Sequence, residues 1–91
     1  MIGYARVSTA DQDLSAQLEQ LRKAGAAKIF REKISGVRAV RPQLAKLMAT
    51  LGRDDIVVIT KIDRLARSTR ELLNLIAAIA EAGASLKSLG G

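Results

Sequence analysis

The sequence predicts an α/β fold: an open, mainly parallel sheet of about four strands, with helices on both of its faces. Short apolar, β-branched runs alternate along the chain with segments whose apolar residues recur at helical spacing. Each helical segment stops at a glycine, and the connections between segments are short. The resulting order β-α-β-α-β-α-β is typical of a parallel sheet whose strands are joined by crossover helices.

The first strand and helix are predicted from the N-terminal segment. Residues 2–7 form a short apolar run, and residues 8–13 are polar and able to cap a helix. Leucines then recur at i, i+4 and i+7, at Leu14, Leu18 and Leu21. The helix that they predict ends near Gly25, because a helix C-terminus favours glycine.

The second strand and helix flank a basic loop. Residues 28–32 predict a brief strand centred on Ile29 and Phe30, and residues 35–41 form the loop. Pro42 suits the first position of a helix. The apolar residues of that helix recur at i, i+3, i+4 and i+7, at Leu44, Leu47, Met48 and Leu51.

The last three elements follow the same pattern. Residues 56–60 read IVVIT, which is apolar on both faces and predicts a central parallel strand covered by helices on each side. A third helix is expected to begin near Ser68 or Thr69 and to end at Gly83. Its apolar residues are Leu72, Leu75, Ile76 and Ile79. Residues 84–89 are expected to add one more strand.

The composition excludes several kinds of chemistry. The 91-residue chain contains neither cysteine nor histidine, so it cannot build a disulfide, a thiolate or histidine metal site, or a Ser-His-Asp triad. Its length predicts one domain or part of one. The lack of cysteine and of an apolar N-terminal signal fits a cytoplasmic protein. The most apolar segment, residues 72–80, is shorter than the roughly 20 residues that span a bilayer, so no membrane partner is expected.

Positive charge is concentrated in the middle of the chain. The formal net charge is +6, and residues 36–70, with eight bases and three acids, carry +5 of it. A compact basic region predicts binding to a polyanion, most often nucleic acid. The only aromatic residues are Tyr4 and Phe30, which argues against a base-stacking platform. We therefore expect contacts to phosphate groups.

In open parallel sheets, ligands bind outside the carboxyl ends of the strands. We therefore expect the functional residues in the loops that follow the strands. Two loops fit this description, residues 6–13 and residues 61–68, and the basic loop of residues 35–41 adds Arg38 and Arg41. The candidates in them are Arg6, Ser8, Thr9, Gln12, Arg38, Arg41, Lys61, Asp63, Arg64 and Arg67. A serine hydroxyl surrounded by arginines fits metal-free phosphoryl transfer, since arginine binds phosphate oxygens and stabilises added negative charge.

Taken singly, the same residues also fit structural roles. Ser8 fits a helix cap, Arg6 a solvent-facing strand position and Arg41 a plain helix entry. Asp63 and Arg64 fit a surface ion pair of small energetic value. The functional interpretation therefore depends on these residues acting together.

Three segments resemble the serine recombinases of the resolvase/invertase type. They are GYARVSTADQ from Gly3, REKISGVRAVRPQL from Arg31 and KIDRLARSTREL from Lys61. The resemblance is highly specific, because the motifs occur in the family's order and the match covers residues 2–89. It implies a resolvase-like fold, site-specific DNA recombination, double-stranded DNA as the partner, and neither a metal nor a high-energy cofactor.

The resemblance also implies a role for each candidate residue. Ser8 is similar to the nucleophile that attacks a DNA phosphodiester, becomes linked to the 5′ phosphate and releases a 3′ hydroxyl. Family positions that contact the scissile phosphate are matched by Arg6, Arg41, Arg64 and Arg67. Asp63 takes the place of the motif's carboxylate, and either Asp63 or water would accept the serine proton. Gln12 and Ser35 match further polar positions that the family groups with the site. Together with Arg38 and Lys61, which lie in the basic loops, they are expected to support DNA binding.

In this family the catalytic domain continues into a long dimerisation helix, which is followed by a helix-turn-helix module that reads DNA sequence. We therefore expect residues 1–91 to form a single, partial catalytic domain without those parts, in which self-association is limited by the missing interface helix. The alternative is a non-catalytic remnant or regulator that binds DNA or a recombinase subunit. A receiver or flavin-binding module fits the topology but not the arginines.

Overall fold

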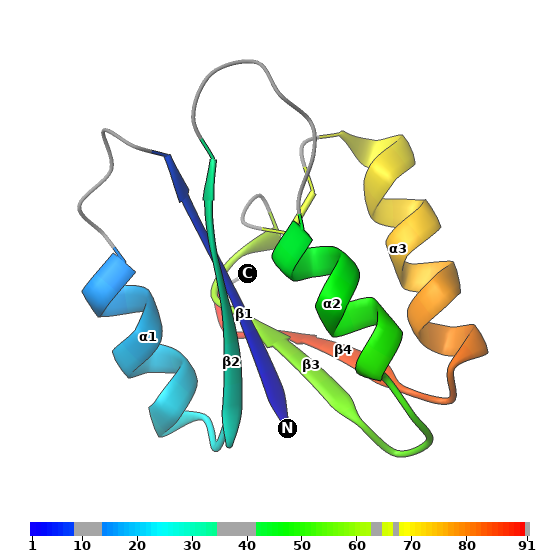
Figure 1. The fold of residues 1–91 in the computed structure, drawn as a ribbon, viewed down its shortest axis with the longest axis horizontal. Helices are drawn as coiled ribbons and strands as arrows, with labels where there is room; N and C mark the ends of the chain where they lie inside the picture. The colour runs from blue at the N-terminus through cyan, green and yellow to red at the C-terminus, as the bar shows by residue number, and fades with distance from the viewer. Residues whose placement is uncertain (9–13, 35–41, 63–64, 67, 91) are drawn as a thin grey trace.

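The computed structural model describes residues 1–8, 14–34, 42–62, 65–66 and 68–90 (Figure 1). The elements are β1 (Ile2–Ser8), α1 (Leu14–Lys23), β2 (Lys28–Ile34), α2 (Pro42–Thr50), β3 (Ile56–Ile59), α3 (Thr69–Glu81) and β4 (Ser85–Ser88). This is the predicted order of strands and helices. None of the helices in the described ranges is long and apolar enough to cross a membrane.

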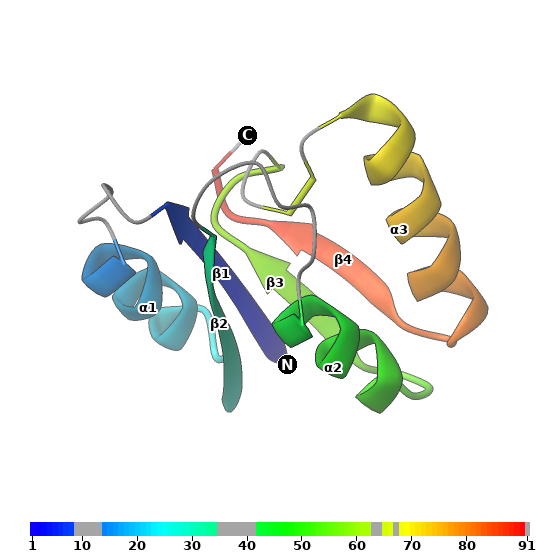
Figure 2. The same cartoon turned by 45° about the horizontal axis from the view of Figure 1, so that its top comes forward.

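The four strands form one parallel sheet in the order β2-β1-β3-β4. β1 pairs with β2 from Ile2, opposite Lys28, to Ser8, opposite Ile34. Because the strands run the same way, their carboxyl ends meet at one edge of the sheet, which is turned toward the viewer in Figure 2. We call this the carboxyl edge.

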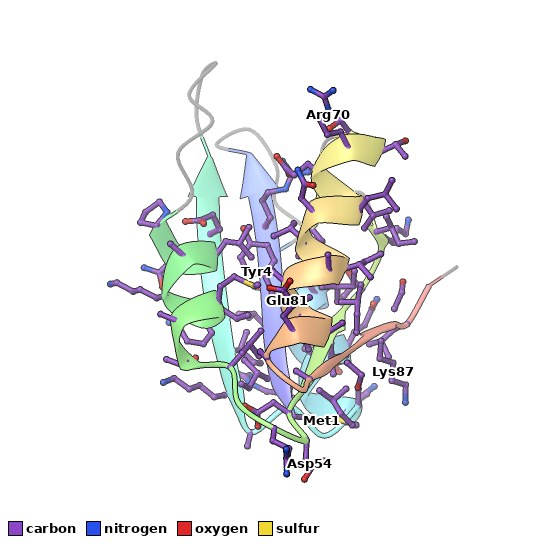
Figure 3. All side chains as sticks on the ribbon, turned by 90° about the vertical axis from the view of Figure 1, so that its right-hand side faces the viewer. Met1, Tyr4, Asp54, Arg70, Glu81 and Lys87 are labelled. Atoms are coloured by element: carbon purple, nitrogen blue, oxygen red, sulfur yellow. The ribbon has the colours of Figure 1, made fainter. Side chains whose placement is uncertain are left out.

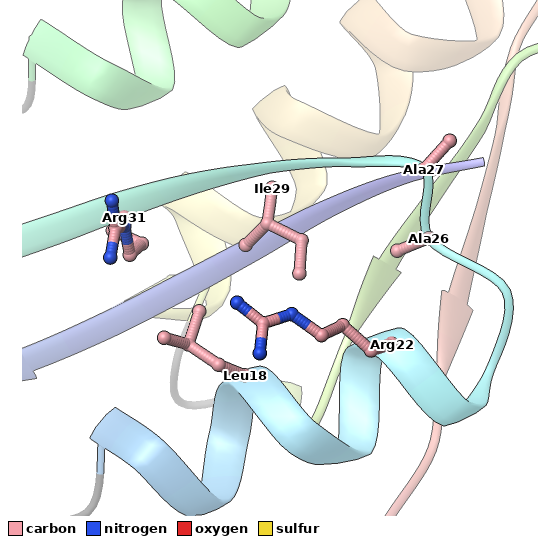
Figure 4. Close-up of a pocket in the computed structure, with 6 residues that line it drawn as sticks. All are labelled: Leu18, Arg22, Ala26, Ala27, Ile29 and Arg31. Carbon is pink, nitrogen blue, oxygen red and sulfur yellow. The ribbon is translucent and has the colours of Figure 1, made fainter.

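Helices cover both faces of the sheet, as predicted. α2 and α3 lie in front of the strands in Figure 3, and α1 lies on the opposite side of the strands from them in Figure 4. The core on the α2–α3 side is formed by Tyr4, Phe30, Leu44, Leu47, Val57, Ile59, Leu65 and Ile79. The core on the α1 side is formed by Ala5, Leu21 and Val58. Neighbouring strand residues such as Tyr4 and Ala5 join opposite cores because successive strand side chains point to opposite faces.

The helix ends follow the capping rules that predict them. Gly25 and Gly83, which follow α1 and α3, have φ angles of 101° and 83°. Only glycine adopts this left-handed conformation without a steric penalty. At the start of α3, the Ser68 side chain accepts a hydrogen bond from the Glu71 backbone N–H at 3.1 Å. The Ser68 hydrogen bond marks the start of α3, and the left-handed conformation of Gly83 marks its end.

The strand lengths differ from the prediction. The sequence predicts β2 over residues 28–32, but the strand runs to Ile34, and β1 includes Ser8, which the sequence places in a polar stretch after the strand. The reason is the continuous ladder between the two strands, whose backbone pairing does not depend on side-chain polarity. The last strand covers only Ser85–Ser88 of the expected residues 84–89.

Candidate active site

The carboxyl half of β1 forms the centre of the candidate site. Ser8 is the last residue of β1, and Arg6 lies two residues before it with its side chain partly buried. The ladder to β2 continues to Ser8, whereas the ladder to β3 pairs only Ile2 and Gly3 of β1. The end of β1 therefore extends past its pairing with β3, on the side of the sheet where the chain after β3 begins.

A buried carboxylate on β2 holds the start of α2. The Glu32 side chain is 4% exposed and accepts hydrogen bonds from the backbone N–H groups of Gln43, at 3.2 Å, and Leu44, at 3.1 Å. The Tyr4 hydroxyl, from β1, donates to the same carboxylate at 3.3 Å. Because free N–H groups and the helix dipole attract an anion, Glu32 fixes the first turn of α2 against the sheet.

These bonds also bracket the basic loop. Glu32 lies three residues before Ser35, and its backbone partners begin directly after Pro42. One side chain, Glu32, therefore links the end of β2, which precedes the segment with Arg38 and Arg41, to the start of α2, which follows it.

A second buried polar side chain holds β1 from the opposite face. Gln17, on α1, is 2% exposed, and its Nε2 donates to the backbone carbonyl of Arg6 at 3.3 Å. Its Oε1 is buried and has no hydrogen-bond partner within the described part of the chain. Helices on both faces are thus hydrogen-bonded to the carboxyl half of β1 or β2.

The segment after β3 is anchored by two buried residues. Leu65 and Ala66 are 1% and 6% exposed, and their N–H groups both donate to the Ile62 carbonyl, at 3.0 and 3.1 Å. Lys61, by contrast, is exposed. Leu65 belongs to the core beneath α2 and α3, so this residue of the third motif, KIDRLARSTREL, is packed against the body of the protein.

The structure describes only part of the predicted site. It brings Arg6 and the backbone of Ser8 to the carboxyl edge and places Lys61 two residues after the end of β3. Seven other proposed residues and Thr9 lie outside the described residues: Gln12, Ser35, Arg38, Arg41, Asp63, Arg64 and Arg67. The arrangement of arginines around the serine therefore stays a prediction.

Sequence reasoning missed Glu32, Tyr4 and Gln17. A signal for Glu32 is present, since it follows Lys28 and Phe30 at alternate positions of a strand and shares the face of Phe30, which is buried. A carboxylate on a buried face requires donors. The donors come from α2 and, through Tyr4, from β1, and nothing in the sequence pairs these segments with Glu32.

A pocket lies away from the carboxyl edge, between α1 and β2 (Figure 4). Its volume is about 420 Å³. The residues that line it are Leu18, Arg22, Ala26, Ala27, Ile29 and Arg31. Since the pocket is lined by the later part of α1 and the first half of β2, it is distinct from the candidate active site.

Comparison with known proteins identifies the family. Residues 1–91 match the family described as "Resolvase, N terminal domain". The chain is 48% identical over 91 residues to a resolvase of Clostridium perfringens, covering 98% of this chain and 48% of that protein. It is 42% identical over 89 residues to the serine recombinase gin of Escherichia phage Mu, covering 98% of this chain and 46% of that protein.

A solved structure has the same fold. The catalytic domain of ISC1926 TnpA, an IS607-like serine recombinase, superposes with a TM-score of 0.84 at 29% identity, over 99% of this chain and 67% of that one. The chain spans about half the length of the curated relatives it matches. The motifs, the parallel sheet and these matches agree, and the chain belongs to the resolvase family of serine recombinases, to whose N-terminal domain it corresponds.

Proposed function

We propose that this chain cleaves and rejoins DNA strands in site-specific recombination, with Ser8 as the nucleophile. The observation that carries the proposal is the family match over residues 1–91, together with the position of Ser8 and Arg6 at the carboxyl edge of a parallel sheet. The chain contains no histidine or cysteine that could serve as an alternative nucleophile or base.

The proposed reaction is a transesterification. The Ser8 hydroxyl oxygen attacks the phosphorus and loses its proton, the bond from phosphorus to the 3′ oxygen breaks, and that oxygen leaves as a 3′ hydroxyl after taking up a proton. The phosphoserine linkage retains the energy of the original bond. Attack by a 3′ hydroxyl on this linkage reverses the step and rejoins the DNA.

The proposed role of the arginines is to stabilise the transition state. A pentacoordinate phosphorus carries additional negative charge, and several guanidinium groups around it lower its energy. The residues proposed for this are Arg6, Arg41, Arg64 and Arg67. Asp63, or water, accepts the serine proton. Binding of the surrounding DNA is supported by Gln12, Ser35, Arg38 and Lys61.

The buried polar bonds support the proposal by giving the site a rigid base. Gln17 holds the Arg6 backbone, and Glu32 holds both ends of the segment with Arg41. Groups that act on a transition state must be held in place before the reaction begins.

Double-stranded DNA is the proposed partner, and rejoining in a new combination requires several copies of the chain. Self-association is therefore part of the proposal. The chain spans about half the length of this resolvase relative, so the proposal concerns the part of such a protein that residues 1–91 match.

A covalent-trapping experiment tests the chemistry. The chain is incubated with supercoiled plasmid, and the products are separated under denaturing conditions, digested and analysed by mass spectrometry. We expect a nucleotide attached to Ser8 and no adduct with Ser8→Ala, which retains every arginine and should bind DNA as the parent does. An adduct that persists in Ser8→Ala would contradict the assignment. DNA binding without any adduct would instead favour a non-catalytic module.

A further inference from the structure

The pocket between α1 and β2 contains two arginine side chains from different elements. Arg22 comes from the last turn of α1 and Arg31 from the middle of β2. Figure 4 shows the Arg22 guanidinium pointing into the space between Leu18 and Ile29, with Arg31 on the same side of the strand. Small side chains, Ala26 and Ala27, form the rest of the lining and leave the space open.

The carboxylates on these two elements are engaged elsewhere. Glu19, the only acid on α1, forms an ion pair with Lys23 at 3.4 Å. Glu32, the only acid on β2, points to the opposite face, where it bonds to Tyr4 and the start of α2. Among the described residues, no carboxylate is paired with either pocket arginine. The pocket therefore holds two positive charges without a counterion from these ranges.

The neighbouring lysines do not share this environment. Lys23 is paired with Glu19, and the Lys28 ammonium lies 5.0 Å from the centre of the Phe30 ring. Charged residues on an edge strand such as β2 also discourage pairing with other strands, and this requires no pocket. Both guanidinium groups instead line one depression, and arginine binds phosphate oxygens in a planar, bidentate geometry.

We propose that Arg22 and Arg31 bind a backbone phosphate of duplex DNA beside the point of cleavage. This inference rests on the proposed function, since it takes duplex DNA to be bound at the carboxyl edge. Arg31 lies three residues before the end of β2, which is about 10 Å along the strand. Phosphates follow one another every 3.4 Å or so along the axis of each DNA strand. A duplex that crosses the edge strand β2 thus brings flanking phosphates within reach of the pocket.

The test compares two double variants of equal charge. Arg22→Gln with Arg31→Gln removes the pocket cations, and Lys23→Gln with Lys28→Gln removes two charges from the same two elements but outside the pocket. Both are made in the Ser8→Ala background, so that only binding is measured. Fluorescence anisotropy with a labelled duplex gives the affinity over a range of salt concentrations.

We expect the pocket variant to bind about tenfold more weakly than the matched control. We also expect its slope of log K against log salt to fall by about 1 more than that of the control, as for the loss of one phosphate contact. Equal effects of the two variants would overturn the proposal, because the arginines would then contribute only general positive charge.

A phosphate titration separates the possible sources of the anion. The Nε–H signals of Arg22 and Arg31 are followed by NMR as inorganic phosphate and then the duplex are added. Shifts of both signals with the duplex support the proposal. Shifts with inorganic phosphate alone would overturn it in favour of a free anion as ligand.

The binding and trapping experiments can fail independently, so the phosphate site and the proposed catalysis by Ser8 are tested separately. A pocket effect on binding without a Ser8 adduct would leave a phosphate site on a non-catalytic module. A Ser8 adduct with no pocket effect would remove only the present inference.

Discussion

At the scale of single residues, Glu32 links the two strands and the helix that surround the basic loop. Its carboxylate is buried and accepts from Tyr4, Gln43 and Leu44. A buried N–H group that loses its acceptor carries the full cost of its desolvation, so the surroundings of Glu32 depend on this one side chain.

Replacing Glu32 should therefore destabilise the protein far more than replacing an exposed glutamate. We expect Glu32→Ala to lower the free energy of unfolding by about 2 to 3 kcal/mol, and Glu32→Gln by less, since the amide oxygen still accepts a hydrogen bond. Glu19→Ala is the matched control: the Glu19 side chain is 69% exposed, and among the described residues it forms an ion pair only with Lys23, so a loss below about 0.5 kcal/mol is expected. Urea denaturation gives the values, and equal losses would refute the role of Glu32.

At the scale of elements, the start of α3 shows how a local motif fixes the segment before it. Ser68 has an extended backbone, with φ −148° and ψ 160°, and its side chain accepts from Glu71. Leu65 and Ala66, which lie shortly before it in the chain, are buried, so a cap and a core contact hold the described residues ahead of α3.

Removal of this cap should shorten or weaken α3 without touching the core. Ser68→Ala is expected to reduce the unfolding free energy by about 1 kcal/mol, the usual value of an N-cap serine. Ser85→Ala serves as the control, because Ser85 is exposed on β4. Thermal unfolding monitored by circular dichroism measures both. A loss for Ser85→Ala as large as that for Ser68→Ala would show that the cap contributes nothing particular.

At the scale of the whole molecule, a small sheet is stabilised by two unequal cores. The radius of gyration is 12.2 Å, close to the roughly 12 Å expected of a compact domain of this length. The core under α1 has three fully buried apolar residues, and most of the buried apolar side chains lie under α2 and α3. Global stability should therefore depend mainly on the α2–α3 side.

Two leucines, one buried and one exposed, test how much burial on the α2–α3 side contributes to global stability. Leu47 on α2 is 0% exposed, whereas Leu73 on α3 is 60% exposed. We expect Leu47→Ala to cost about 2 to 5 kcal/mol through lost burial and the cavity that remains, and Leu73→Ala less than about 0.5 kcal/mol. Chemical denaturation of both variants measures the difference. Similar losses would mean that the burial of Leu47 in the α2–α3 core does not contribute to stability.

Much of the architecture is readable from local patterns. The leucine spacing before Gly25 indicates a helix through its period of about 3.6 residues, and the continuous β-branched, apolar run at residues 56–60 indicates a buried strand; both signals depend only on neighbours in the chain. The length of β2 is not readable in this way. It runs to Ile34 because β1 lies beside it, and a ladder between segments that are distant in sequence leaves no local pattern.

The sequence by itself determined the order of the elements, the parallel sheet and the motifs that place the chain among the resolvases. Only the tertiary structure decided which side chains meet. It turns Glu32 toward α2 and Arg31, one residue earlier, to the other face, where it lines the pocket between α1 and β2. The physical reason is that alternate strand residues face opposite sides, and what each side meets depends on the helices packed there.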